Sequence, residues 1–89
     1  MISKTTRSFR DNLRDLPDAV RRQARAAYLL FRDNPRHPGV QFKLVHSPLS
    51  IYSARVSRSY RAVGVLSGDV IIWFFIGSHA EYEQLLRRL

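Results

Sequence analysis

The spacing of the hydrophobic residues changes at one segment of the chain, Asn34-Pro35-Arg36-His37-Pro38-Gly39, which is dense in residues that break regular structure. Before this loop, hydrophobic residues recur three and four positions apart, as on one face of a helix. After it they recur every second position, as on one face of a strand. The helical spacing returns in Ala80–Leu89. We therefore predict an α+β fold in which helices, then strands, then a short closing helix follow one another.

Two helices are predicted before the loop. Phe9, Leu13 and Leu16 fall at i, i+4 and i+7 of a short first helix, at whose start Ser8 and Asp11 resemble a capping box. Pro17-Asp18 interrupts this helix, and a second one follows as far as about Asn34, where Pro35 stops it. The apolar side of the second helix consists of Val20, Ala24, Ala27, Tyr28 and Phe31.

The other face of the second helix carries arginines. An ordinary solvated face explains them, but a leucine lies among them where a purely solvated face would not favour one. The alternative is a surface that docks a partner, and both interpretations stay open. The residues of this face are Arg21, Arg25, Leu29 and Arg32, with Arg22 beside them.

Four strands are predicted after the loop, at Val40–Val45, Ile51–Val56, Tyr60–Leu66 and Val70–Ile76. Their short connections imply a four-stranded antiparallel meander, on which the two N-terminal helices pack. The last strand does not alternate between apolar and polar residues. We therefore expect it to be covered on both faces and to lie at the centre of the sheet.

Length and composition exclude several classes of protein. Eighty-nine residues predict a single domain over 1–89. The lack of cysteine excludes disulfides and a cysteine-ligated zinc, and it favours a reducing, cytoplasmic environment. The polar, basic N-terminus is unlike a signal peptide, and the longest apolar run, Val70–Gly77, is far shorter than the ~20 residues of a membrane-spanning helix.

The charge of the chain suggests an anionic partner. Fifteen Lys plus Arg against seven Asp plus Glu leave a net charge of +8, and only Lys4 and Lys43 among these cations are lysines. Arginine binds phosphate or carboxylate with a planar fork of donors, whereas a GC-rich genome is an alternative cause of the arginine excess. Residues 1–38 hold nine of the cations and four of the acids, so we expect the helices to supply most of the long-range attraction to a polyanion.

Strand alternation places Arg55 and Arg61 on one face of the sheet if the opposite face packs on the helices. Lys43 is expected to join them, and we group Arg58, in the turn between the two arginine-bearing strands, with these phosphate-binding candidates. Cations that converge on rigid strands form an anion site. The alternative is that each of them points separately into solvent.

His79 follows Gly77-Ser78 at the junction between the last strand and the last helix. Its position makes it the best candidate for a general acid or base, because an imidazole both takes and gives up a proton near neutral pH. A capping or packing histidine is the alternative. Tyr82 is placed to present its hydroxyl beside His79, although packing in the core explains this tyrosine as well.

Other kinds of site are not supported. The three histidines have neither i, i+4 spacing nor a nearby acidic pair, and no glycine-rich phosphate loop exists, so we expect no metal and no cofactor. No acid lies in a predicted strand, which argues against hydrolysis by paired carboxylates. The remaining groups are those of a metal-free ribonuclease: a base for the 2′-hydroxyl, cations for the charge on the phosphorane, and an acid for the leaving 5′ oxygen.

The order of the predicted elements resembles that of the RelE/ParE superfamily of bacterial toxin–antitoxin toxins. The resemblance covers nearly the whole chain from about residue 9 and implies a further leading strand, which would have to come from Lys4–Ser8. Five segments carry it: Leu16-Pro17-Asp18, Asn34-Pro35-Arg36-His37-Pro38-Gly39-Val40, Tyr52-Ser53-Ala54-Arg55-Val56, Tyr60-Arg61-Ala62-Val63 and Trp73-Phe74-Phe75-Ile76-Gly77-Ser78-His79-Ala80-Glu81-Tyr82.

The superfamily that the chain resembles is divided in function. RelE-like members are ribosome-dependent mRNA endonucleases that cut without a metal, whereas ParE-like members inhibit DNA gyrase and lack the nuclease residues. Arg61 matches a strand arginine found in both branches, and His79 with Tyr82 matches by position the C-terminal pair of the nuclease branch. The paired lysines of the best-known nucleases are missing, with Lys43 and Arg55 as substitutes.

The resemblance therefore implies a toxin that inhibits translation as an endoribonuclease, with Arg61, His79 and Tyr82 as catalytic residues. A non-catalytic gyrase inhibitor, or a toxin-fold binding protein without nuclease activity, is the alternative. By the same resemblance, the expected partners are mRNA and the ribosome, or gyrase, together with a cognate antitoxin. This antitoxin is expected to cover the cationic sheet face or the arginine-bearing second helix.

Overall fold

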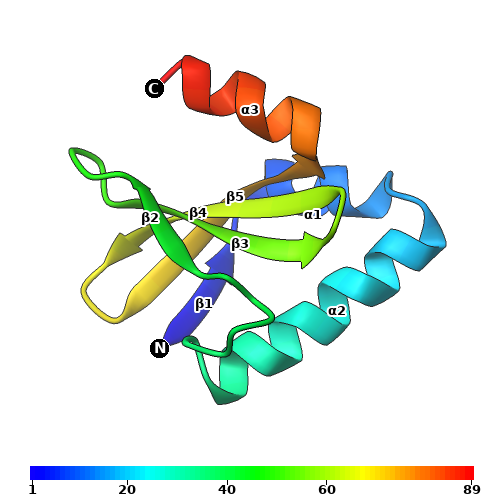
Figure 1. The fold of residues 1–89 in the computed structure, drawn as a ribbon, viewed down its shortest axis with the longest axis horizontal. Coiled ribbons are helices and arrows are strands. Elements are labelled where there is room, and N and C mark those ends of the chain that lie inside the picture. Colours follow the sequence, from blue (N-terminus) through cyan, green and yellow to red (C-terminus); the bar gives the residue numbers. More distant parts are fainter.

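A computed structural model describes residues 1–89 and contains five strands and three helices (Figure 1). Helices α2 and α3 lie on opposite sides of a twisted sheet, and β1 lies at one edge of that sheet. The elements in chain order are β1 (Ile2–Thr5), α1 (Arg7–Arg14), α2 (Asp18–Asp33), β2 (Lys43–His46), β3 (Ile51–Ser57), β4 (Tyr60–Ser67), β5 (Val70–Ser78) and α3 (His79–Arg87).

The strands form one sheet in the order β1-β5-β4-β3-β2. Strands β2 to β5 pair antiparallel with their neighbours in sequence, which confirms the predicted meander. Strand β1 pairs parallel with β5 and supplies the leading strand that the resemblance implies. This strand occupies Ile2–Thr5 and not Lys4–Ser8, because Arg7 and Ser8 already belong to α1.

Two predicted boundaries were wrong for local reasons. Helix α1 is capped by Thr6, whose hydroxyl accepts a hydrogen bond from the Phe9 amide at 3.1 Å, and not by the proposed pair Ser8 and Asp11. Strand β2 begins at Lys43 and not at Val40, because Gln41 has a φ of 50°, which interrupts an extended backbone.

The position of β5 differs from the expectation. This strand is interior, since β1 and β4 flank it, but the middle strand of the five is β4. Ile71 and Trp73 of β5, which face α1 and α2, are buried, whereas Ile72 between them faces the other side of the sheet and is 37% exposed. The long apolar run therefore fills one face completely and the other only in part.

Two hydrophobic clusters lie on the two faces of the sheet. Helices α1 and α2 cover one face, where Phe31 of α2 packs edge-on against Trp73 of β5 with ring centroids 5.4 Å apart. Helix α3 covers the other face, where Tyr82 packs with Ile51 and Val63. The alternation along β3 and β4 that was predicted from the sequence produces these two clusters.

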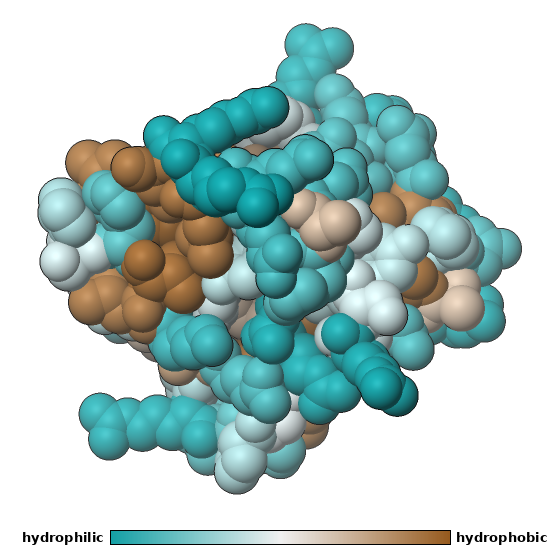
Figure 2. Space-filling model, turned by 45° about the horizontal axis from the view of Figure 1, so that its top comes forward, coloured by the Kyte–Doolittle hydropathy of each residue, from teal (hydrophilic) through white to brown (hydrophobic).

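Helix α3 leaves part of its sheet face uncovered. It spans nine residues and buries only Tyr82 fully. In Figure 2 hydrophobic residues gather at the left, on the side where Figure 1 has the C-terminus and the β2–β3 connection. Leu49 and Leu89, in or next to these segments, are large exposed hydrophobic residues, whereas the exposed Leu44 pairs with Tyr52 and so projects to the face of α1 and α2. None of the three helices is long and apolar enough to cross a membrane.

Candidate functional site

The predicted strand cations share the sheet face on which α3 packs. Arg55 of β3 lies directly opposite Arg61 of β4, and Arg61 lies opposite Gly77 of β5. Lys43 of β2 lies opposite Ser53, two positions before Arg55 on β3. Because directly opposed residues project to the same face, the register brings all three cations to one side of the sheet.

Arg61 is held at this face by contacts from two other elements. Its Nη2 donates a hydrogen bond to Oε1 of Gln41 at 3.2 Å, and its guanidinium carbon lies 6.0 Å from the centre of the Tyr82 ring. Its Nε and Nη1 are buried, and no protein group accepts a hydrogen bond from either. Arg61 is therefore a fixed cation with two unpaired donors that are shielded from solvent, so an anionic oxygen would reach them only after a local movement of the side chains around them.

Tyr82 and His79 stand side by side on the first turns of α3. Their ring centroids are 5.7 Å apart. The helix begins with a capping box in which Ser78 and Glu81 satisfy each other's backbone amides, and the His79 amide donates to the Ser59 carbonyl of the β3–β4 turn at 2.8 Å. The start of α3 is thus fixed against the end of the sheet that carries Arg61.

His79 has a carboxylate partner on its own helix. Its Nε2 lies 3.1 Å from Oε1 of Glu83, one helical turn further on, and the imidazole remains about half exposed. Glu83 therefore orients the ring and leaves Nδ1 for another partner. Tyr82, in contrast, is only 6% exposed, so its ring belongs to the core and also contacts both His79 and Arg61.

The ion pairs of the protein avoid the sheet site. On the helices, Arg7 and Arg14 pair with Asp11, Arg21 with Asp18, and Arg32 with Asp33. None of Lys43, Arg55, Arg58 and Arg61 pairs with a carboxylate. The helices hold more cations, but acids neutralise several of them locally. The expectation that the helices supply most of the long-range attraction to a polyanion already counted these acids and stays a prediction, while the cations of the sheet have no carboxylate partner.

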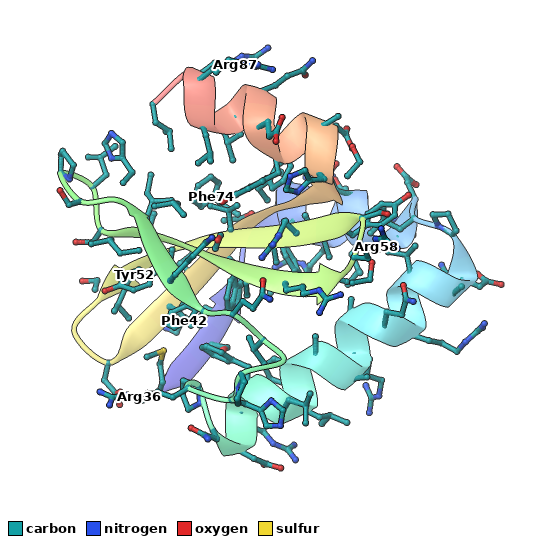
Figure 3. All side chains as sticks on the ribbon, viewed as in Figure 1. Arg36, Phe42, Tyr52, Arg58, Phe74 and Arg87 are labelled. Carbon is teal, nitrogen blue, oxygen red and sulfur yellow. The ribbon has the colours of Figure 1, made fainter.

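Arg58 lies in the turn between β3 and β4, at the end of the sheet where α3 begins (Figure 3). It is exposed. This end of the sheet thus presents Arg58 beside the His79 region, while Lys43 lies on the other side of Arg55 along β3. The four phosphate-binding candidates thus come from three strands, β2, β3 and β4, and from the turn between β3 and β4.

A cavity of about 380 Å³ lies on the opposite face, between α1, α2 and the sheet. Its lining is mostly apolar and includes Arg21 and Arg25 of α2; Arg55 borders it between Ala54 and Val56, although the register places the Arg55 side chain on the α3 face. Arg21 is paired with Asp18, whereas Arg25 and Arg55 form no ion pair. Of the predicted partner-docking residues on α2, Leu29 and Arg32 do not reach this cavity, and Leu29 is half-buried.

Sequence reasoning missed three residues around the site. Glu83 follows His79 by four positions, and this helical spacing was an available signal. Ser53 is fully buried between Lys43 and Val63 in the register, and its hydroxyl has no hydrogen-bond partner. Gln41 contacts Arg61 across twenty positions, and no local pattern indicates this pairing.

Comparison with solved structures finds the same fold in several proteins, among them toxins of toxin–antitoxin complexes. A chain of the RelB–RelE antitoxin–toxin complex from Methanococcus jannaschii superimposes with a TM-score of 0.73 at 14% identity, covering 92% of this chain and 96% of that chain. The isolated RelE toxin of E. coli gives 0.66 at 21% identity, with 99% and 98% covered. YafQ of E. coli gives 0.68 at 13% identity, with 90% and 94% covered. No curated protein sequence matches the chain.

These sequence identities are too low to assign a family, but a family model does assign one. The model of the ParE-like toxin domain matches residues 18–84, which include α2, the whole meander and the start of α3. The matched part contains the cations of the sheet face together with His79 and Tyr82. The chain therefore belongs to the ParE-like toxin domain family, and it is a toxin of the RelE/ParE superfamily of toxin–antitoxin systems.

Proposed function

We propose that this toxin is a metal-independent, ribosome-associated endoribonuclease that cleaves mRNA. One observation carries the proposal: the fixed guanidinium of Arg61, the Tyr82 ring and the His79 imidazole are in contact on a sheet face whose cations no carboxylate neutralises. The structural likeness to RelE and YafQ toxins supports the fold on which such a site is built.

In this mechanism each side chain of the candidate site has a stated role. His79 takes the proton of the 2′-hydroxyl, through the ring nitrogen that Glu83 leaves free. Arg61 stabilises the charge that develops on the phosphorane, and Arg55, Lys43 and Arg58 bind the flanking phosphates. The ring of Tyr82 keeps Arg61 and His79 in place. Its hydroxyl donates a proton to the leaving 5′ oxygen.

Mapping of transcript ends tests this function. Expression of the toxin is expected to produce new 5′ ends in mRNA, detected by primer extension, and His79→Ala and Arg61→Ala are expected to abolish them. Toxin that has been treated with EDTA and returned to a magnesium buffer is expected to cleave mRNA on ribosomes as well as untreated toxin does. An absence of new 5′ ends, together with His79→Ala being as toxic as the unchanged protein, would overturn the enzyme assignment.

Gyrase is the second candidate target, and the match to the ParE-like family model favours keeping it. The ParE-like branch that the sequence resembles acts without the nuclease residues, and the missing lysine pair agrees with such a role. Purified toxin would then block supercoiling of relaxed plasmid by gyrase, and His79→Ala would block it equally. Normal supercoiling at saturating toxin would exclude this candidate.

We also propose a cognate antitoxin as a partner. Chains of the RelB–RelE antitoxin–toxin complex and of the DinJ–YafQ complex share this fold. The proposed docking surface is α2, with Arg21, Arg25, Leu29 and Arg32, and the unpaired Arg25 is its sharpest test. Arg25→Glu is expected to weaken binding of the protein encoded beside the toxin, whereas Arg7→Glu on α1 serves as the control.

A further inference from the structure

Gln41 adopts a backbone conformation that its residue type does not favour. It stands between Val40, which is 1% exposed, and β2, and its φ is 50°. A residue with a Cβ rarely adopts this left-handed region, which glycine and asparagine enter more easily. The only other non-glycine residue with positive φ is Ser50, in the connection between β2 and β3. Serine is a common turn residue, whereas glutamine is not.

The side chain of Gln41 makes a contact that compensates for this conformation. Its Oε1 accepts the hydrogen bond from Nη2 of Arg61, at 3.2 Å. Apart from this bond, only the bond between Trp73 and Ser3 joins side chains far apart in the sequence. Gln41 is therefore a long-range contact of the strand arginine that the proposed site depends on, and it lies on a segment whose start is anchored by buried Val40.

The contact leaves the charge of Arg61 intact. A glutamine carbonyl orients a guanidinium without neutralising it, whereas a carboxylate at the same place would form an ion pair and compete with a phosphate. Tyr82 packs against the same guanidinium at 6.0 Å. Arg61 thus has a neutral acceptor and an aromatic ring as neighbours, and its Nε and Nη1 have no protein partner.

We propose that Gln41 is a positioning residue that fixes the guanidinium of Arg61 for phosphate binding, and that its left-handed backbone directs the side chain to this arginine. The phosphate-binding half of the inference rests on the proposed function. The ordering of Arg61 by Gln41 does not depend on it, because that ordering is a property of the free protein.

Two Gln41 variants and one control separate the effect of losing the acceptor from the effect of adding a charge. Gln41→Gly favours the left-handed backbone and removes the acceptor, Gln41→Glu keeps an acceptor but adds a charge, and Ser50→Gly is the matched control at the other positive-φ position. The measurements are the thermal unfolding midpoint, the ¹⁵N order parameter of the Arg61 Nε–H group in the free protein, and the affinity for a short fluorescein-labelled oligouridylate.

Gln41→Gly is expected to unfold at no lower temperature than the unchanged protein, to lower the order parameter of Arg61 and to bind oligouridylate about threefold to tenfold more weakly, the effect of one hydrogen bond. Gln41→Glu is expected to keep Arg61 ordered and still bind more weakly. Ser50→Gly is expected to change neither the order parameter nor the affinity.

An unchanged order parameter of Arg61 in Gln41→Gly would overturn the inference. So would unchanged oligouridylate affinity in both Gln41 variants while Arg61→Ala loses binding. If the unchanged protein binds oligouridylate no better than Arg61→Ala, the RNA-binding function fails, and the order parameter alone then decides whether Gln41 positions Arg61.

Discussion

Arg55 and Arg61 face each other directly across β3 and β4, and neither forms an ion pair with a carboxylate. Like charges directly opposite each other destabilise a sheet. Repulsion between the two arginines therefore lowers the free energy of unfolding of the free protein. An anion bound between the two side chains would remove this repulsion.

Arg55→Gln is expected to stabilise the free protein and weaken its binding to RNA. Relief of the repulsion raises the free energy of unfolding by about 0.5 kcal/mol, which corresponds to a rise of about 2–4 °C in the unfolding midpoint of a domain of this size. The loss of one phosphate contact lowers the salt slope of oligouridylate binding by about 0.7. Arg58→Gln in the exposed turn is the control for stability, and a lower midpoint in Arg55→Gln would contradict the prediction.

Ser53→Ala is expected to raise the free energy of unfolding by about 1 kcal/mol, because it removes a buried hydroxyl that has no hydrogen-bond partner. Urea unfolding followed by circular dichroism measures the change. Ser59→Ala, in the exposed β3–β4 turn, should stay within about 0.5 kcal/mol of the unchanged protein. A loss of stability in Ser53→Ala would mean that the hydroxyl has a partner.

Glu83→Gln is expected to slow mRNA cleavage without changing oligouridylate affinity, since Glu83 contacts the imidazole and none of the cations of the sheet face. The expected loss is about tenfold, which is smaller than the loss of about a hundredfold or more expected for His79→Ala, where the proton-transfer group itself is removed. Gln84→Ala on the same exposed helix is the control. Equal cleavage by Glu83→Gln and the unchanged toxin would remove Glu83 from the mechanism.

Gly64→Ala is expected to destabilise the fold by about 1–3 kcal/mol through overpacking. A Cβ at this position would lie 2.9 Å from Cδ1 of Ile71 and 3.0 Å from the carbonyl oxygen of Ile72, and the backbone of β5 cannot yield to it easily. Gly68→Asn is the matched control, because Gly68 has a φ of 59° with nothing within 4 Å of a Cβ, and asparagine tolerates this backbone. Comparable losses in the two variants, measured by urea unfolding, would refute the close contact at Gly64.

Much of the fold was predictable because its signals are local. Helix α2 ends before Pro35, because proline has no backbone N–H to donate and its ring clashes with the preceding helical turn. The alternation along β3 and β4 likewise predicts the two sheet faces that the structure shows. Strand β1 was placed a few residues too late, because a four-residue edge strand carries little pattern of its own. Its position depends on its parallel pairing with β5 and on the hydrogen bond from the Ile2 amide to the carbonyl of Asp69, the residue before β5.

By itself the sequence determined which residue types the candidate site contains: arginines on alternating strands and a histidine at a strand-to-helix junction. Only the tertiary structure decided which of them meet. The register set Arg55 against Arg61, and the packing of α3 brought the Tyr82 ring to Arg61 and His79. The contact of Gln41 with Arg61 depends on where a loop crosses the end of the sheet, and such a contact leaves no periodic signal in the chain. Periodicity reports the face on which a side chain lies, whereas the neighbours on that face are set by strand pairing and packing.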